Sequence, residues 1–87
     1  MNQVIVYIHS HAAEHFEKIG NLKTRNEINY FIKRLQSNPE TKSNYQQPDP
    51  KGRMLEIKLI GRQAIIFFKD PFANIIKILD IRNIETL

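Results

Sequence analysis

Three apolar runs separated by short turns, all in the C-terminal half of the chain, restrict its fold more than any other feature. The runs are LEIKLI, QAIIFF and IIKILDI, and Lys or Arg borders or interrupts each of them. β-Branched and aromatic residues favour strands, and turns this short favour antiparallel pairing of consecutive strands. We therefore expect strands near 53–60 and 63–69 and a last strand that ends near 82, joined by turns at Gly61 and at 70–74.

The N-terminal part predicts a strand followed by a short helix. Residues 4–8 are β-branched or aromatic, which favours a strand. After Ser10, apolar residues recur at spacings of four and three, and Gly20 stands where a helix is expected to stop. These apolar positions are Ala12, Phe16 and Ile19.

A second, longer helix is predicted between Thr24 and Asn38. Thr24 and Glu27 have the spacing of a capping box, in which each side chain satisfies an otherwise unpaired backbone N–H at the helix start. Asn38 and Pro39 are expected to end the helix. The apolar stripe of this helix consists of Ile28, Phe31, Ile32 and Leu35.

The segment 40–52 is polar and contains two prolines, so we expect a surface loop that ends in a turn at 49–52. The element order is then β-α-α-β-β-β. This order predicts an α+β fold in which two helices pack on one face of a small antiparallel meander. With 87 residues the chain can build one core, so we expect a single domain over residues 1–87.

The charge and composition limit the classes of partner. Lys and Arg number 13 against 9 Asp and Glu, a net charge of +4 that favours nucleic acid, an anionic membrane or an acidic protein. Cysteine is absent, no apolar run approaches the ~18 residues of a membrane span, and Met1 does not open a signal sequence. We therefore expect a cytoplasmic protein without a membrane partner.

The sheet residues of this chain resemble those of the RelE/ParE toxin superfamily. The resemblance extends to the first strand, the helix pair and the Asn38–Pro39 stop, and so covers nearly the whole chain. It implies the toxin of a type II toxin–antitoxin pair, an endoribonuclease that cuts mRNA in the ribosomal A site in the RelE branch. The residues that carry it are Gly52, Arg53, Leu55, Ile57, Gly61, Phe67, Ile78, Leu79, Ile81 and Arg82.

The resemblance also implies a set of site residues. Attack by a 2'-OH on the adjacent phosphate needs a proton acceptor, cations for the developing charge and a donor for the leaving oxygen. Arg53 and Arg82 match basic positions of the family, whereas Ala64 stands where the family usually has Arg, and we expect Arg62 to replace that charge. No Tyr occurs in 83–87, where the family often has a base-stacking aromatic. The catalytic set is thus Arg53, Arg62 and Arg82, with Lys51, Lys58, Lys69 and Lys77 as RNA-binding residues.

Other interpretations of the same residues stay open. Basic residues at alternating strand positions are also typical of a solvated sheet face, and Arg82 has Asp80 and Glu85 as alternative surface partners. His11 and His15, at i and i+4, could share a metal or supply a general base, but Glu14 is expected to point elsewhere on the helix. We therefore expect no metal and no cofactor.

The last strand suggests that something covers the second face of the sheet. Ile75 and Leu79 alternate with Ile76 and Ile78, so both faces of this strand are apolar. The resemblance implies an antitoxin from an adjacent gene as the covering partner, with mRNA and the ribosome as targets; a homodimer through this face is the alternative. The alternative function is a non-catalytic protein of the same fold, either a ParE-like gyrase poison or a protein- or nucleic-acid-binding module without RNase activity.

Overall fold

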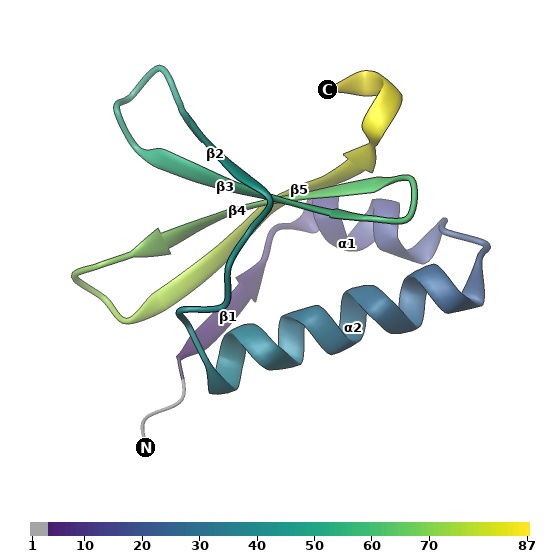
Figure 1. The fold of residues 1–87 in the computed structure, drawn as a ribbon, viewed down its shortest axis with the longest axis horizontal. Coiled ribbons are helices and arrows are strands. Elements are labelled where there is room, and N and C mark those ends of the chain that lie inside the picture. Colours follow the sequence, from purple (N-terminus) through teal and green to yellow (C-terminus); the bar gives the residue numbers. More distant parts are fainter. Residues whose placement is uncertain (1–3) are drawn as a thin grey trace.

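A computed structural model describes residues 4–87 of the chain, and Figure 1 shows its fold. The described residues form two helices, five strands and a final 3-10 turn. In chain order they are β1 (Ile5–Ile8), α1 (Ser10–Glu17), α2 (Leu22–Ser37), β2 (Tyr45–Pro48), β3 (Met54–Ile60), β4 (Gln63–Asp70), β5 (Ile75–Asn83) and η1 (Ile84–Thr86).

The five strands form one sheet in the order β1-β5-β4-β3-β2. β3, β4 and β5 pair antiparallel as a meander, which confirms the predicted core of the sheet. β1 lies parallel to β5, with Tyr7 opposite Lys77, so the complete sheet is mixed. Parallel strands need a long crossover between them, and here α1, α2 and the other three strands supply it. The α+β class is confirmed.

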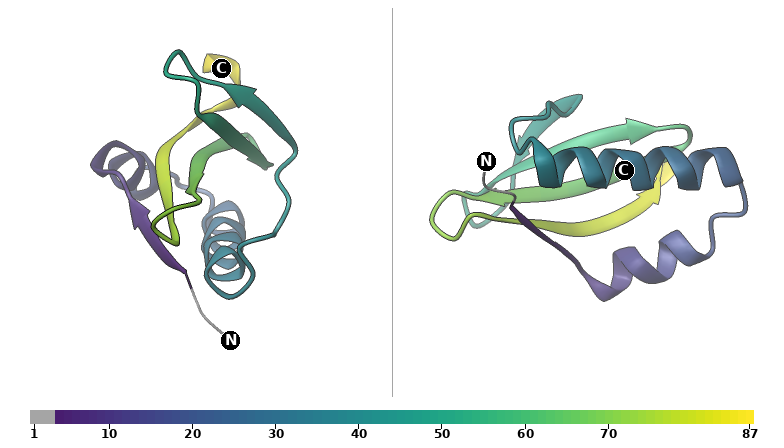
Figure 2. Two further views of the ribbon diagram at one scale, coloured as in Figure 1. Left: turned by 90° about the vertical axis from the view of Figure 1, so that its left-hand side faces the viewer. Right: turned by 90° about the horizontal axis from the view of Figure 1, so that it is seen from below.

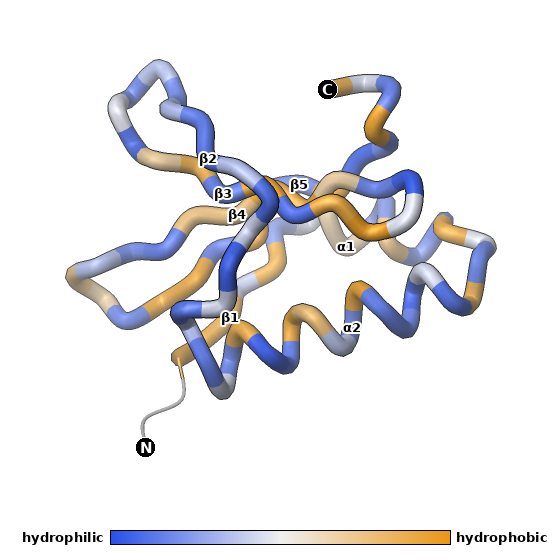
Figure 3. Tube along the Cα trace, in the orientation of Figure 1, coloured by the Kyte–Doolittle hydropathy of each residue, from blue (hydrophilic) through white to orange (hydrophobic). Residues whose placement is uncertain are grey.

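Both helices lie on the same face of the sheet, as predicted (Figures 1 and 2). Apolar and polar residues alternate along α2 in Figure 3, because one stripe of the helix faces the sheet and the other faces water. The Phe31 ring meets the Phe67 ring edge to face, with 5.7 Å between centroids. No helix within residues 4–87 is long and apolar enough to cross a membrane. The buried core contains Val4, Ala12, Ile19, Ile28, Phe31, Leu35, Ile60, Ile65, Phe67, Ile76, Ile78 and Ile81.

The predicted start of the second helix is wrong by three residues, because the expected N-cap is Thr24 and the observed one is Asn21. α2 begins at Leu22, and its N-cap is Asn21, whose side-chain oxygen accepts a hydrogen bond from the Thr24 backbone N–H at 3.1 Å. Thr24 therefore lies inside the first turn, and the expected capping box does not form. Asn is at least as good an N-cap as Thr, so Asn21 can start the helix three residues earlier. The predicted stop at Asn38 and Pro39 is confirmed.

The segment expected to be a loop contains a strand, β2, which pairs antiparallel with β3. All four of its residues are exposed, so no apolar pattern marks it in the sequence. Glu56 of β3 holds it in place, because its carboxylate accepts hydrogen bonds from Ser43 and from Gln46, each at 2.7 Å. The Asn44 side chain adds a hydrogen bond from the Leu59 N–H at 2.8 Å. The polar side chains that suggested a loop are thus the groups that fasten an edge strand.

Candidate nucleic-acid interface

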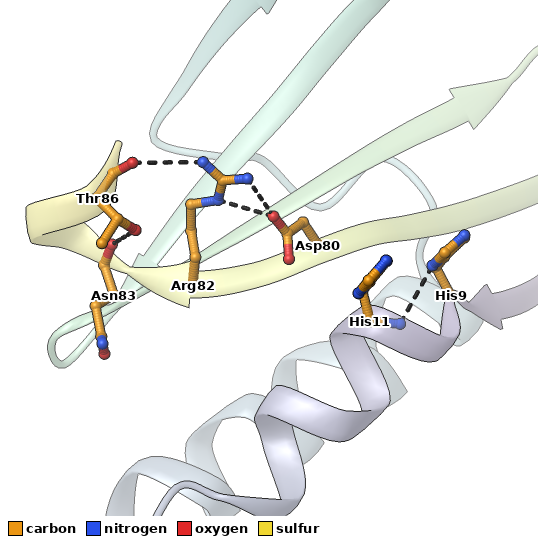
Figure 4. A network of polar contacts seen from close by, with 6 residues as sticks. All are labelled: His9, His11, Asp80, Arg82, Asn83 and Thr86. Carbon is orange, nitrogen blue, oxygen red and sulfur yellow. Dashed lines mark hydrogen bonds and ion pairs between the residues drawn. The ribbon is translucent and has the colours of Figure 1, made fainter.

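Arg82 lies near the end of β5, on the sheet face opposite the helices, where it pairs with Ala64 of β4. Its Nε donates to an Asp80 carboxylate oxygen at 2.8 Å, and its Nη1 donates to the Thr86 carbonyl at 3.4 Å (Figure 4). Of the two carboxylates considered from the sequence, Asp80 is therefore the partner in this structure. The guanidinium is half-exposed, so this ion pair is a weak one that a phosphate can displace.

A depression of about 520 Å³ separates this end of β5 from α1. Asp80, Arg82 and Thr86 line one side of it. The other side is formed by one face of α1, namely His11, Glu14, His15 and Lys18. Glu14 therefore faces the same depression as the histidines, contrary to the expectation that it points elsewhere, because positions i, i+3 and i+4 share a helix face.

A second depression, of about 570 Å³, continues from the first and shares His15 and Lys18 with it. Its other walls include Arg62, Gln63 and Asn83. We call the two depressions together the α1–β5 groove. Three cations, Lys18, Arg62 and Arg82, line this groove.

A hydrogen-bond chain inside the groove fixes the orientation of His15. Gln63, which is buried, donates through Nε2 to the Asn83 side-chain oxygen at 2.9 Å. Its Oε1 lies 2.7 Å from Nε2 of His15. Because an amide oxygen only accepts, His15 donates from Nε2, which leaves Nδ1 of the neutral ring as a proton acceptor. This pairing could not be predicted from the residues alone, because the partners lie 48 and 20 residues apart in the chain.

Arg62 lies in the turn between β3 and β4 and not on the strand. Gly61, beside it, has a φ of 58°, a backbone conformation that favours glycine and makes the tight turn. The Arg62 side chain is 86% exposed and pairs with Glu85 of η1 at 3.1 Å. The turn and η1 are also joined by the Ile84 N–H, which donates to the Arg62 carbonyl at 2.9 Å.

Arg53 lies at the opposite end of the sheet from Arg62. The two residues flank β3, whose seven residues separate them by roughly 25 Å. Arg53 donates from Nε to Asp49 at 2.7 Å and covers the Phe68 ring at 5.2 Å. Although burial alone raises the pKa of the Asp49 carboxyl, the hydrogen bonds and positive charge of Arg53 and a Lys51 backbone N–H hold that pKa below its ordinary value. Arg53 therefore closes the β2–β3 turn, far from the α1–β5 groove.

The four lysines expected to bind RNA do not gather on one surface. Lys58 faces the helices, with its amine 5.6 Å above the Phe31 ring, and Lys69 donates to the Thr41 carbonyl at 3.3 Å. Lys51 is exposed in the β2–β3 turn. Lys77 is exposed on the opposite face of the sheet, beside Tyr7 of β1. Lys18 was not predicted from the sequence. It is the lysine that lines the same groove as Arg62 and Arg82.

Two of the three histidines, His11 and His15, line the groove, whereas His9 does not. His9 is the N-cap of α1, where its Nδ1 accepts from the His11 N–H at 3.2 Å. The His9 and His11 rings are stacked, with 5.3 Å between their centroids. Both side chains are drawn in Figure 4. Within residues 4–87, no three His, Cys, Asp or Glu side chains come together in a group that could hold a metal ion.

The centre of the sheet face opposite the helices is apolar. We call this surface the open face; its central positions are Leu55, Ile57, Leu59, Ala64, Ile66 and Phe68. Ala64 is fully buried and Ile57 is 3% exposed, although neither helix covers them. At the margin of this face Ile5 and Tyr7 remain more than half exposed, at 58% and 57%.

Solved structures that resemble this chain were found, although no protein-family model and no curated protein matches its sequence. A chain of the archaeal RelE–RelB complex from Pyrococcus horikoshii OT3 matches with a TM-score of 0.78 and 15% identity, over 93% of this chain and 94% of that chain. The E. coli toxin RelE, with two arginines replaced by alanine and in the free state, matches with a TM-score of 0.71 and 10% identity, over 97% and 86% of the two chains. The RelBE2 toxin–antitoxin complex of Mycobacterium tuberculosis matches with a TM-score of 0.65 and 14% identity, over 93% and 98%.

These matches span nearly all of this chain and nearly all of each matched chain. They agree with the two helices on one face of the sheet and with the β3–β4–β5 meander. The resemblance inferred from the sheet residues is confirmed for the fold. The chain has the fold of the RelE toxins.

Proposed function

We propose that this chain is the toxin of a toxin–antitoxin pair and that it cleaves mRNA on the ribosome. The α1–β5 groove carries the proposal, because it places Lys18, Arg62 and Arg82 around a histidine whose proton-accepting nitrogen is defined. The fold supports it, since the matched structures are those of RelE toxins. The proposed activity needs ribosomes and mRNA, and therefore the cytoplasm.

The reaction is an attack of the 2'-oxygen on the adjacent phosphorus. A bond forms between the 2'-oxygen and phosphorus, and the bond from phosphorus to the 5'-oxygen of the next nucleotide breaks. The 2'-OH loses its proton to a base, and the 5'-oxygen gains a proton from water as it leaves. The products are a 2',3'-cyclic phosphate and a 5'-hydroxyl, and no metal or cofactor takes part.

His15 and the three cations of the groove have roles in this proposal. Nδ1 of His15 accepts the 2'-OH proton, and an imidazole is a suitable base near neutral pH. Arg82 exchanges Asp80 for the phosphate and stabilises the charge that develops on its oxygens. Arg62 and Lys18 hold the neighbouring phosphates. Arg53 is assigned no part in the chemistry, because it lies at the far end of β3.

The direct test is cleavage of an mRNA on purified translating ribosomes, with the ends of the products identified chemically. The wild type is expected to produce 2',3'-cyclic phosphate ends. Arg82→Ala is expected to slow cleavage by about 10²-fold or more, and His15→Gln by about 10²- to 10⁴-fold. The matched control is Arg53→Ala, an arginine of the same sheet with its own carboxylate partner, which should cleave like the wild type.

Two results would contradict the proposal. The first is the absence of ribosome-dependent cleavage by the folded wild type. The second is an equal loss of rate in the Arg82 and Arg53 variants, because cleavage would then not depend specifically on the groove residues. Circular dichroism and thermal unfolding of each variant show that a loss of rate does not come from misfolding.

The apolar open face supports a second candidate function, binding to a protein target without RNA cleavage, as a ParE-like poison of gyrase would do. Ala64, where the resemblance implies Arg, brings no charge to this face. If this function holds, Ile66→Glu on the open face abolishes growth arrest while Arg82→Ala leaves it intact. The reverse result supports the cleavage function.

We also propose that the product of an adjacent gene binds this chain as its antitoxin. Two of the matched structures, from P. horikoshii and M. tuberculosis, are toxin–antitoxin complexes. Co-expression with the neighbouring open reading frame should yield a complex that no longer cleaves mRNA. Sedimentation of the chain alone then tests the alternative, a homodimer through the open face.

A further inference from the structure

A pair of stacked histidine rings stands at the start of α1. The planes of the His9 and His11 rings differ by 7°, and both side chains are exposed. His9 is held in place because its Nδ1 accepts a hydrogen bond from the His11 backbone N–H. In an offset parallel pair each ring covers only one face of the other, so the exposed outer faces can accept a further flat ring. Figure 4 draws both histidines beside β5, the strand that carries Arg82.

The two rings line different depressions of the surface. His11 lines the α1–β5 groove, together with Arg82. His9 lines a hollow of about 240 Å³ that also contains Tyr7 and Lys77, and we call it the β1–β5 hollow. The histidine pair therefore connects the groove to this hollow.

β5 borders both depressions and carries a cation at each of them. Arg82 lies at the groove and Lys77 at the hollow. Their positions along the strand put them roughly 16 Å apart, the length of about five stacked nucleotides at ~3.4 Å each. Lys77 is exposed and forms no ion pair among the residues that the structure describes. A single strand that lies along β5 can thus place one phosphate at each cation.

Aromatic rings follow the same path. Tyr7 lies opposite Lys77 in the register of β1 and β5, and it is 57% exposed. The rings of His11, His9 and Tyr7 therefore accompany the two cations from the groove to the hollow. Proteins that bind single-stranded nucleic acid combine such rings, on which bases stack, with cations that contact the backbone. Histidine stacks on unpaired RNA bases as the larger aromatic residues do.

We infer that this path is a base-stacking subsite for the single-stranded RNA on one side of the cleaved bond. One base stacks on His11, which His9 supports from behind, and another base stacks on Tyr7. Lys77 binds a phosphate at the far end of the path. The inference rests on the proposed function, because it extends the strand whose phosphate lies at Arg82. These residues position the RNA and take no part in the chemistry.

Two ligands of equal charge separate base stacking from phosphate binding. One is an RNA octanucleotide whose 2'-hydroxyls are methylated, so that it cannot be cleaved; the other is an abasic backbone of the same length. Both are long enough to reach Lys77 as well as the groove. Fluorescence anisotropy of the labelled ligands measures the Kd of each for the full chain. The wild type should bind the RNA about tenfold or more tightly than the abasic backbone.

Variants assign this preference for RNA to the rings. His11→Ala and Tyr7→Ala should each reduce the ratio of the two Kd values about fivefold. His11→Phe keeps a flat ring at the same position and should retain the preference. Tyr30→Ala is the matched control, because Tyr30 is a similarly exposed tyrosine on α2, at 64%, and its loss should leave the ratio unchanged.

The cation and the wild-type rings give two further readings. Lys77→Ala should reduce the magnitude of the salt slope by about 0.7 for both ligands, whereas Lys33→Ala, which removes an exposed lysine of α2, should not change it. NMR of the wild type needs no variant to fold. The ring protons of His11 and Tyr7 should shift upfield with the RNA and not with the abasic backbone, while those of Tyr30 stay unchanged.

Two results would overturn the inference. One is equal affinity of the wild type for the two ligands, and the other is a loss of preference in His11→Phe as large as in His11→Ala. Ribosomal cleavage of mRNA is a separate measurement. If the wild type cleaves mRNA but does not prefer RNA over the abasic backbone, the subsite fails and the proposed function stands. If the preference depends on the rings but no cleavage occurs, the proposed function fails and the subsite stands.

Discussion

The salt dependence of RNA binding tests which cations of this chain contact RNA. The α1–β5 groove contains Lys18, Arg62 and Arg82. Each phosphate of a single strand that a protein neutralises contributes about −0.7 to the slope of log K against log salt concentration. Three contacts therefore give a slope of about −2, which weakens binding about 20-fold between ~50 and ~200 mM salt. Fluorescence anisotropy of a short labelled single-stranded RNA measures this slope.

Single substitutions divide the slope among the residues. Arg82→Ala and Arg62→Ala should each reduce its magnitude by about 0.7, and Arg53→Ala should leave it unchanged. Asp80→Asn frees the Arg82 guanidinium from an exposed ion pair worth at most about 1 kcal/mol, and should tighten binding up to about fivefold. A slope near zero, or an equal effect of the Arg53 and Arg82 variants, would refute the assignment of RNA to this groove.

Three further predictions concern stability. Glu56→Ala removes the acceptor of the Ser43 and Gln46 hydrogen bonds and should lower the free energy of unfolding in urea by about 2–4 kcal/mol. A loss below about 0.5 kcal/mol would mean that water replaces these bonds. Because the pKa of Asp49 is lowered in the folded state, its ionised carboxyl stabilises the fold at pH values above the ordinary pKa of 3.8, and this stabilisation is lost as pH falls through the folded-state pKa. The difference in unfolding midpoint between wild type and Asp49→Asn should therefore be largest at neutral pH and smaller in acid. A difference that does not change with pH would contradict the assignment. Gly61→Ala places a Cβ 3.0 Å from the Thr24 hydroxyl oxygen, at a backbone φ of 58°, and should destabilise the fold by about 1–2 kcal/mol. Gly20→Ala is the control, because Gly20 has open space around it and its substitution should not destabilise the fold. Equal effects of the two substitutions would argue against the turn geometry.

The sheet meander and both helices could be predicted because their signals are local. Apolar periodicity places β3, β4, β5 and α2 almost at their observed limits, and Asn38 with Pro39 ends α2 where expected. The strand β2 could not be predicted, because its residues are polar and exposed. Its pairing depends on Glu56, which lies ten residues away from Gln46 and gives no local sign of its role.

The candidate site was harder to predict than the fold, because it depends on how distant segments meet. Arg53, Arg62 and Arg82 look equivalent in the sequence, yet the length of β3 puts Arg53 at the other end of the sheet. In the sequence Lys18 is an ordinary lysine at the end of a helix, and it becomes part of the site only because α1 lies beside β5. The tautomer of His15 depends on Gln63 and Asn83, which only the three-dimensional structure brings together.

Growth arrest on induced expression tests whether this chain is a toxin that acts through the α1–β5 groove. The comparison includes the wild type, an Arg62→Ala/Arg82→Ala double variant and the Arg53→Ala control, each shown by circular dichroism to be folded. We expect arrest, with cleaved mRNA, by the wild type and the control but not by the double variant. Arrest by the double variant equal to that of the wild type would contradict the role of the groove, and arrest by none of the three would contradict a toxin.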